Sequence, residues 1–147
     1  MQNSFQGSDT CCFNIEYQVL PQECGLISLK MITDYYGMCL SLDSIRSRCI
    51  QTDEGVSLYN LNKCSQDLGF LTMMTKCSIN ELISIIPLPT ITYLKHKHYV
   101  VIYYIDDEHI WVADPLSGYK QYTFDEFSRI WYLDGEGKGV LLVLELR

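Results

Sequence analysis

The sequence lacks any long hydrophobic run. None of its segments reaches the roughly 18 consecutive apolar residues that a membrane-spanning helix needs. The N-terminus, MQNSFQGSDT, is polar and has no apolar stretch of the kind found in a signal peptide. Clusters of lysine and arginine are missing too, and the net charge at pH 7 is −7. Such a chain repels phosphate backbones and gains no attraction to anionic lipid, so a nucleic-acid partner and a membrane-surface partner are both disfavoured.

Internal repeats and proline-rich linkers are also missing, and only four prolines occur in 147 residues. A chain of this length commonly forms one domain and buries enough surface to be stable without disulfides or a metal. Residues 1–15 show no periodicity, so we expect a loose N-terminal arm at 1–15 and a single domain at 16–147. The cysteines number seven. An odd count without a signal peptide argues against a secreted disulfide framework and favours a reducing cytosol.

The apolar residues change from a helical to an alternating period near the middle of the chain. The first half predicts helices, the strongest of which begins at Cys24 and ends before Gly37. The second half predicts strands, together with two short helices opened by capping boxes. Helices followed by an antiparallel sheet indicate an α+β fold. The expected helices are 24–36, a short one after Ser41, 57–68, one opening at Ser78 and one from Thr123 to Trp131; the expected strands are 70–76, 90–95, 98–105, 110–113, 119–122 and 140–146.

Cys24 opens the strongest predicted helix and is followed by Gly25, which adds no side-chain bulk beside the sulfur. A thiol at a helix N-terminus lies at the positive end of the helix dipole, which favours the nucleophilic thiolate. By itself the pattern is weak, because a lone cysteine in an apolar run is more often a small buried hydrophobe. That second interpretation is the one we adopt for Cys39, Cys49, Cys64 and Cys77.

A base for this thiol must come from three histidines. His109 lies in the polar turn DDEH and is expected to be solvated, whereas His96 and His98 stand at the start of the most apolar predicted strand. Asp114 favours His98: if two strands pair about the intervening polar turn, position 98 lies opposite 115, within one step of Asp114. A carboxylate beside an imidazole is the base and its orienting group in a nucleophilic triad. An ordinary hairpin fits the same spacing, and the residues alone leave both interpretations open.

Gln18 stands six residues before Cys24, across a turn that contains Pro21. A side-chain amide in this place can donate a hydrogen bond to a developing oxyanion, together with the backbone N–H of Cys24. Without the cysteine, an isolated glutamine would be read as a solvated surface residue. The function of Gln18 therefore depends on that of Cys24.

Taken together, these residues resemble the peptidase domain of bacteriocin-exporting ABC transporters, which cleaves double-glycine leader peptides and includes the processing domains of lanthipeptide transporters. The resemblance covers roughly residues 16–146. Two departures are small: Glu23 stands where many members have Asp, and Tyr99 where Phe is frequent, and neither is expected to affect the mechanism. The matching positions are Gln18, Cys24, Gly25, Tyr35-Tyr36-Gly37, His98 and Asp114-Pro115.

The resemblance implies a papain-like fold, with an N-terminal helical subdomain packed against a C-terminal antiparallel sheet. It implies a cysteine endopeptidase that removes leaders after a Gly-Gly, Gly-Ala or Gly-Ser site from bacteriocin or lanthipeptide precursors, coupled to export by an ABC transporter. The implied roles are Cys24 as nucleophile, His98 as base, Asp114 as its orienting group and Gln18 as oxyanion donor. No cofactor is implied. The implied partners are an amphipathic leader helix and the transmembrane and ATPase domains of a transporter, at the cytoplasmic face of the membrane.

Three alternatives remain at this point. The first is a catalytically silent module that only tethers the substrate peptide to a transporter; relatives of that kind lack the nucleophile, which is present here. The second is a papain-like amidase or acyltransferase, which would share the triad but not this spacing. The third is a metal site formed by Cys11, Cys12 and His96 or His98, which is weak because no Cys-x-x-Cys pair occurs.

Overall fold

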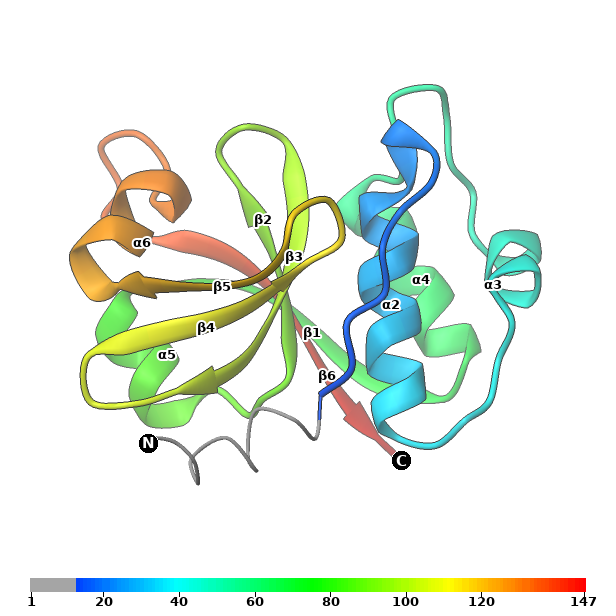
Figure 1. Ribbon diagram of the computed structural model, residues 1–147, viewed down its shortest axis with the longest axis horizontal. Helices are drawn as coiled ribbons and strands as arrows, with labels where there is room; N and C mark the ends of the chain where they lie inside the picture. Colours follow the sequence, from blue (N-terminus) through cyan, green and yellow to red (C-terminus); the bar gives the residue numbers. More distant parts are fainter. Residues whose placement is uncertain (1–12) are drawn as a thin grey trace.

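Six antiparallel strands form one sheet at the centre of the computed structural model, which describes residues 13–147 (Figure 1). Their spatial order is β1-β6-β2-β3-β4-β5, so the last strand of the chain lies between the first two. The strands are β1 (Phe70–Cys77), β2 (Thr90–Leu94), β3 (His98–Ile105), β4 (His109–Asp114), β5 (Gly118–Thr123) and β6 (Gly139–Leu146).

Helices lie on both sides of this sheet, with α2, α3 and α4 on one side and α5 and α6 on the other (Figure 1). The sheet therefore separates two apolar cores, one built around Leu26, Leu29 and Ile32 of α2 and the other around Phe127 and Trp131 of α6. The helices are η1 (Pro21–Glu23), α2 (Cys24–Tyr35), α3 (Leu42–Arg48), α4 (Leu58–Asp67), α5 (Ile79–Ile85) and α6 (Phe124–Trp131).

The helix boundaries follow the caps that the sequence predicts. Ser41 and Ser57 each accept a hydrogen bond from a backbone N–H in the first turn, and Ser78 and Thr123 open complete capping boxes with Glu81 and Glu126. Gly37 follows α2 with a positive φ of 74°, which only glycine adopts freely. The predicted α+β architecture, with helices before an antiparallel sheet, is confirmed. The short 3-10 helix η1 was not predicted from the sequence as a separate element.

Residues 13–15 pack against the domain, contrary to the prediction that they belong to a loose arm. The Phe13 side chain is 2% exposed and stacks on Tyr103 with ring centroids 5.3 Å apart. The Tyr119 hydroxyl donates to the Phe13 carbonyl at 2.6 Å and accepts from the Ile15 N–H at 3.0 Å. The prediction failed here because the partners of Phe13 are distant in the sequence: Tyr35 is 22 positions away, Tyr103 is 90 and Tyr119 is 106. The rest of the predicted arm, residues 1–12, lies outside the described residues.

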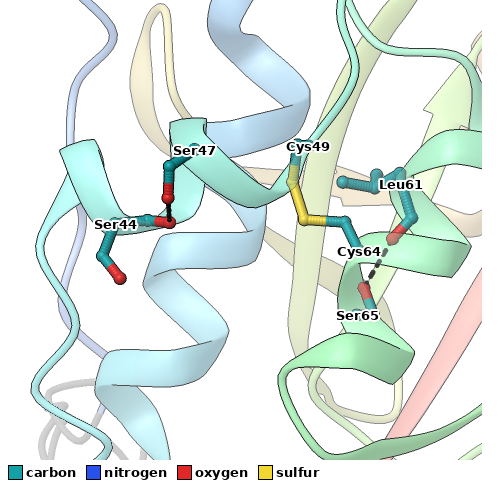
Figure 2. Close-up of a disulfide and its surroundings, with 6 residues drawn as sticks. All are labelled: Ser44, Ser47, Cys49, Leu61, Cys64 and Ser65. Carbon is teal, nitrogen blue, oxygen red and sulfur yellow. Dashed lines mark hydrogen bonds between the residues drawn. A yellow bond between two sulfur atoms is a disulfide. The ribbon is translucent and has the colours of Figure 1, made fainter.

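Cys49 and Cys64 form a disulfide between the end of α3 and the middle of α4 (Figure 2). Their Cα atoms are 5.2 Å apart, within the usual range for a disulfide. The interpretation of these two as separate hydrophobes is therefore wrong, because the packing of α3 on α4 brings together residues that are 15 positions apart. It is also wrong for Cys39, which is exposed in the loop after α2, whereas Cys77 is buried as expected.

Candidate active site

Cys24 is the first residue of α2, as predicted, and lies where that helix meets strand β3. Its side chain is buried, and its sulfur accepts a hydrogen bond from the backbone N–H of Tyr99 at 3.5 Å. Gly25 makes this approach possible, because a Cβ there would lie 2.5 Å from Val56 Cγ1 and 3.0 Å from Tyr99 Cδ2. The thiol therefore lies at the positive end of a helix dipole and beside a backbone donor, as a candidate nucleophile would.

His98 and Asp114 form a buried pair at the end of the sheet, next to Cys24. His98 Nε2 and Asp114 Oδ1 are 2.6 Å apart, and the Leu116 N–H donates to the same carboxylate oxygen at 2.8 Å. Because Nε2 faces the carboxylate, Nδ1 is the ring nitrogen that remains for the Cys24 sulfur. The imidazole thus lies between a carboxylate and a thiol.

The predicted pairing of strands β3 and β4 is wrong by one residue. Val101 pairs with Ala113, so Asp114 is level with Val100, and position 98 is not opposite 115. Near the turn Ile105 pairs with Ile110, two residues from the predicted register. A β-bulge between Ile102 and Tyr104, which a sequence of alternating apolar residues does not reveal, then shifts the pairing back by one. Because side chains alternate along a strand, the observed register puts Asp114 on the same sheet face as His98, two positions along. The bulge therefore allows the pair to form.

The pKa values of this pair move apart, as expected for an ion pair. Burial by itself would lower the pKa of His98, but the hydrogen bonds to Asp114 and Cys24 and the charges of both groups raise it to about 9. Burial would likewise raise the pKa of Asp114, but the bonds from His98 and from the Leu116 N–H lower it to about 2. At neutral pH the site therefore favours an imidazolium next to a carboxylate.

The other two histidines lie outside this pair. His96 is exposed at the tip of the β2–β3 hairpin, and its ring stacks on that of His98 with centroids 5.6 Å apart. His109, expected to be solvated, is half-buried, with Nδ1 3.6 Å from Asp106 Oδ1. The structure thus places only His98 between a carboxylate and a cysteine among the described histidines.

Gln18 is anchored beside the pair through its backbone. Its N–H donates to the Pro115 carbonyl at 2.9 Å, one residue after Asp114. Its side-chain amide donates to the carbonyls of Leu20 and Pro21 at 3.3 and 3.1 Å, and its Oε1 is buried without a hydrogen-bond partner in the described structure. Gln18 therefore lies in the turn that leads to Cys24, as predicted, but its side-chain amide donates its hydrogen bonds within that turn.

Glu23 is a site residue that the sequence reasoning missed. It is 1% exposed and forms a forked ion pair with Arg46 of α3, at 2.7 and 2.8 Å, and it also accepts from Gln51 Nε2 at 3.3 Å. The Arg46 bond and the smaller contribution from Gln51 outweigh burial and lower the pKa of Glu23. Since Glu23 directly precedes Cys24, it ties the start of α2 to α3. The sequence signal that could have identified Glu23 is its position as an acidic residue directly before the candidate nucleophile.

Metal ligands are not gathered anywhere in residues 13–147: no three His, Cys, Asp or Glu side chains are placed to hold an ion. Cys11 and Cys12, from the alternative metal site, lie outside the described residues. Within residues 13–147, none of the helices is both long and apolar enough to cross a bilayer.

Comparison with known proteins gives one family match and a set of relatives. The model of the peptidase C39 family matches residues 12–136. The chain is 32% identical over 122 residues to the lactococcin-G-processing and transport ATP-binding protein LagD of Lactococcus lactis, covering 80% of this chain and 17% of that protein. It is 28% identical over 121 residues to the pediocin PA-1 transport/processing ATP-binding protein PedD of Pediococcus acidilactici, covering 78% and 17%. The chain thus spans about a sixth of the length of these relatives.

Two solved structures share the fold. One is a double glycine motif protease from an AMS/PCAT transporter in complex with its leader peptide, with a TM-score of 0.83, 22% identity and 91% coverage of both chains. The other is the peptidase domain of Streptococcus ComA, with a TM-score of 0.81, 19% identity and coverage of 92% of this chain and 99% of that one. These likenesses confirm the papain-like arrangement of helical and sheet subdomains that the sequence suggested.

The buried Glu23–Arg46 pair predicts a pH-dependent stability. Replacing Glu23 with glutamine (Glu23→Gln) removes the charge that Arg46 binds and is expected to lower the free energy of unfolding at pH 7 by about 1–3 kcal/mol. The folded-state pKa of Glu23 lies below its ordinary value of 4.5. The carboxylate's contribution is therefore complete above 4.5 and is lost as the pH falls through the lowered pKa.

Denaturant unfolding of wild type and Glu23→Gln between pH 3 and 7 checks this, with the exposed Glu108→Gln as the control variant. The gap between wild type and Glu23→Gln should shrink toward pH 3. A gap of the same size at every pH would contradict the ion pair.

Proposed function

Since the chain belongs to the peptidase C39 family, we propose that it is a cysteine endopeptidase in which Cys24 is the nucleophile, His98 the general base and Asp114 the group that orients the imidazole. The observation that carries this proposal is the buried His98–Asp114 bond of 2.6 Å beside a thiol at the start of a helix. These are the nucleophile, base and orienting group of a triad, brought together from three separate elements.

In the proposed reaction, the thiol proton of Cys24 is already held on His98 Nδ1 when the sulfur attacks the carbonyl carbon of the scissile peptide bond. Imidazolium then protonates the departing amine, which leaves an acyl-enzyme thioester. His98 next takes a proton from water as the water attacks the thioester, releasing the carboxylate product and the free thiol. Asp114 holds Nε2–H throughout, so the same ring nitrogen always faces the sulfur.

The oxyanion would be bound by the Cys24 backbone N–H together with the amide of Gln18. This amide now bonds to the carbonyls of Leu20 and Pro21, so donation to a substrate would exchange one of those bonds. The turn that carries Gln18 is held by the Pro115 carbonyl, which supports a fixed position of the side chain near the nucleophile.

We infer the substrate class from the relatives, which process and export bacteriocins, and from the double glycine motif protease whose structure holds a leader peptide. The chain would cut after a Gly-Gly, Gly-Ala or Gly-Ser site and release the leader of a bacteriocin or lanthipeptide precursor. The leader would bind as an amphipathic helix. Export would be coupled to the cut by transmembrane and ATPase domains. The matched relatives are named as transport ATP-binding proteins, and this chain spans about a sixth of their length.

The cytoplasmic face of a membrane is the location that this role requires. A free catalytic thiol suits a reducing compartment, whereas a disulfide such as Cys49–Cys64 is rare there. The free thiol favours a reducing compartment and the disulfide favours an oxidising one, so the location stays a prediction.

A peptide assay tests the proposed activity. The chain is expected to cut a peptide that consists of an amphipathic leader ending in Gly-Gly and a short core, and Cys24→Ala should lower the rate by on the order of 10⁴-fold or more because the nucleophile is lost. Product formation is followed by chromatography and mass spectrometry, with Cys39→Ser at the exposed thiol as control. Unchanged cutting by Cys24→Ala would remove the proposal. Leader binding by a wild type that cuts nothing would favour the silent tether.

The pH profile tests the role of Asp114. Because Asp114 raises the pKa of His98, Asp114→Asn should lower that pKa and move the alkaline limb of the kcat profile to lower pH. We expect kcat to fall between about 10- and 100-fold, the loss of one charge-assisted hydrogen bond, with little change in leader binding. Asp107→Asn, on an exposed turn, serves as control. An alkaline limb that stays in place would mean that Asp114 does not act on His98.

A further inference from the structure

A small cavity of about 60 Å³ lies directly beside Cys24. One of its walls is formed by Gly55 and Val56, which precede α4, and the other by Tyr93 and Tyr99 of the sheet. A cavity needs about 10–15 Å³ of such volume to hold one water molecule, so this one has room for a small side chain of a few heavy atoms.

The wall on the helical side is one short segment, residues 49–56, that is held at several points. Cys49 is fixed by its disulfide, and Gln51 donates to Glu23 at 3.3 Å. A tight turn follows, closed by two backbone hydrogen bonds of 2.9 Å between Thr52 and Gly55. Gly55 has a φ of 110°, and a Cβ there would lie 3.0 Å from the Gln22 carbonyl oxygen. The segment is therefore pressed against the turn that carries the nucleophile.

Tyr99 joins this segment to the sheet. Its hydroxyl donates to the Val56 carbonyl at 3.0 Å, and both residues are buried, with Tyr99 4% exposed. Its ring lies against that of Tyr93, with centroids 4.6 Å apart, and its backbone N–H donates to Cys24. Tyr99 therefore contacts the nucleophile through its backbone and the wall at Val56 through its hydroxyl.

We propose that the Tyr99 hydroxyl determines specificity, because its bond to the Val56 carbonyl fixes the width of the cavity beside Cys24 and so admits only glycine, alanine or serine next to the cut. This inference rests on the proposed function. It adds a named group and a mechanism for size selection: the wall cannot move outward without breaking a buried hydrogen bond and leaving the Val56 carbonyl without a partner.

The test compares substrates that differ only in size at the cut. Leader peptides ending in Gly-Gly are compared with the same peptides carrying valine in place of either glycine, and the ratio of kcat/KM values is measured for each enzyme. For Tyr99→Phe, which keeps the ring and removes only the hydroxyl, the preference for glycine over valine should fall about tenfold at one of the two positions. One or two methylene groups in a pocket change selectivity by amounts of this order.

Two further variants keep the result interpretable. Tyr103→Phe is the matched control, since Tyr103 is on the same strand and its hydroxyl makes no hydrogen bond among residues 13–147; it should keep the wild-type ratio. Val56→Ala shortens the wall side chain directly and should also lower the preference for glycine, even if Tyr99→Phe folds poorly. A valine placed about ten residues upstream in the leader should change the rates of all enzymes alike.

The outcomes separate this inference from the proposed function. A wild type that cuts no Gly-Gly peptide would refute the proposed function itself. If wild type cuts and Tyr99→Phe keeps the ratio of Tyr103→Phe, the hydroxyl does not set specificity, while the peptidase proposal stands. If Val56→Ala also keeps that ratio, the cavity is not the place where substrate size is read.

Discussion

Helix α2 packs closely at Gly25 against Tyr99 of strand β3 and against Val56, so that a side chain at position 25 would force these neighbours to shift, and the rest of the site depends on this contact. A Cβ would come within 2.5 Å of Val56 and 3.0 Å of Tyr99. The close approach brings the Cys24 sulfur within hydrogen-bond distance of the Tyr99 N–H and next to the imidazole of the preceding residue, His98. The helical layer and the sheet thus meet where α2 packs on β3. The candidate triad is formed across this contact, which we call the α2–β3 interface.

Interactions on both sides of the α2–β3 interface hold the candidate residues in position. On the sheet side, the β-bulge in β3 and β4 puts Asp114 on the same face as His98, and their charges stabilise each other in a buried place. On the helical side, the Glu23–Arg46 pair and the Cys49–Cys64 disulfide fix the turn before α2 and the segment 49–56. The Tyr99 hydroxyl joins the two sides. The geometry of the His98–Asp114 pair and the width of the cavity beside Cys24 therefore both depend on how the helical layer packs on the sheet.

Much of this could be predicted from the sequence because the signals are local. The caps at Ser41, Ser57, Ser78 and Thr123 and the helix-ending Gly37 act within one turn, so the elements were predicted almost residue by residue. The pairing of His98 with Asp114 was also predicted, although through a register wrong by one. What escaped prediction depends on packing between distant residues: the burial of Phe13 under Tyr103 and Tyr119, the disulfide, and the carboxylate of Glu23 against Arg46. The register could not be read because the turn is centred one residue later than predicted, and because a bulge adds one residue to a strand without changing its composition.

Covalent trapping of Cys24 tests the central claim most directly. The probe is a leader peptide in which a nitrile replaces the carboxyl group of the second glycine. The Cys24 thiol adds across the carbon–nitrogen triple bond and forms a thioimidate, with no leaving group. The intact mass of the chain should then rise by the mass of one peptide, and peptide mapping should find the label on Cys24, which is buried, and not on Cys39, which is exposed. A His98→Ala variant should react far more slowly, because it lacks the base. A label on Cys39 instead, or labelling of Cys24 at the same rate without His98, would contradict the account.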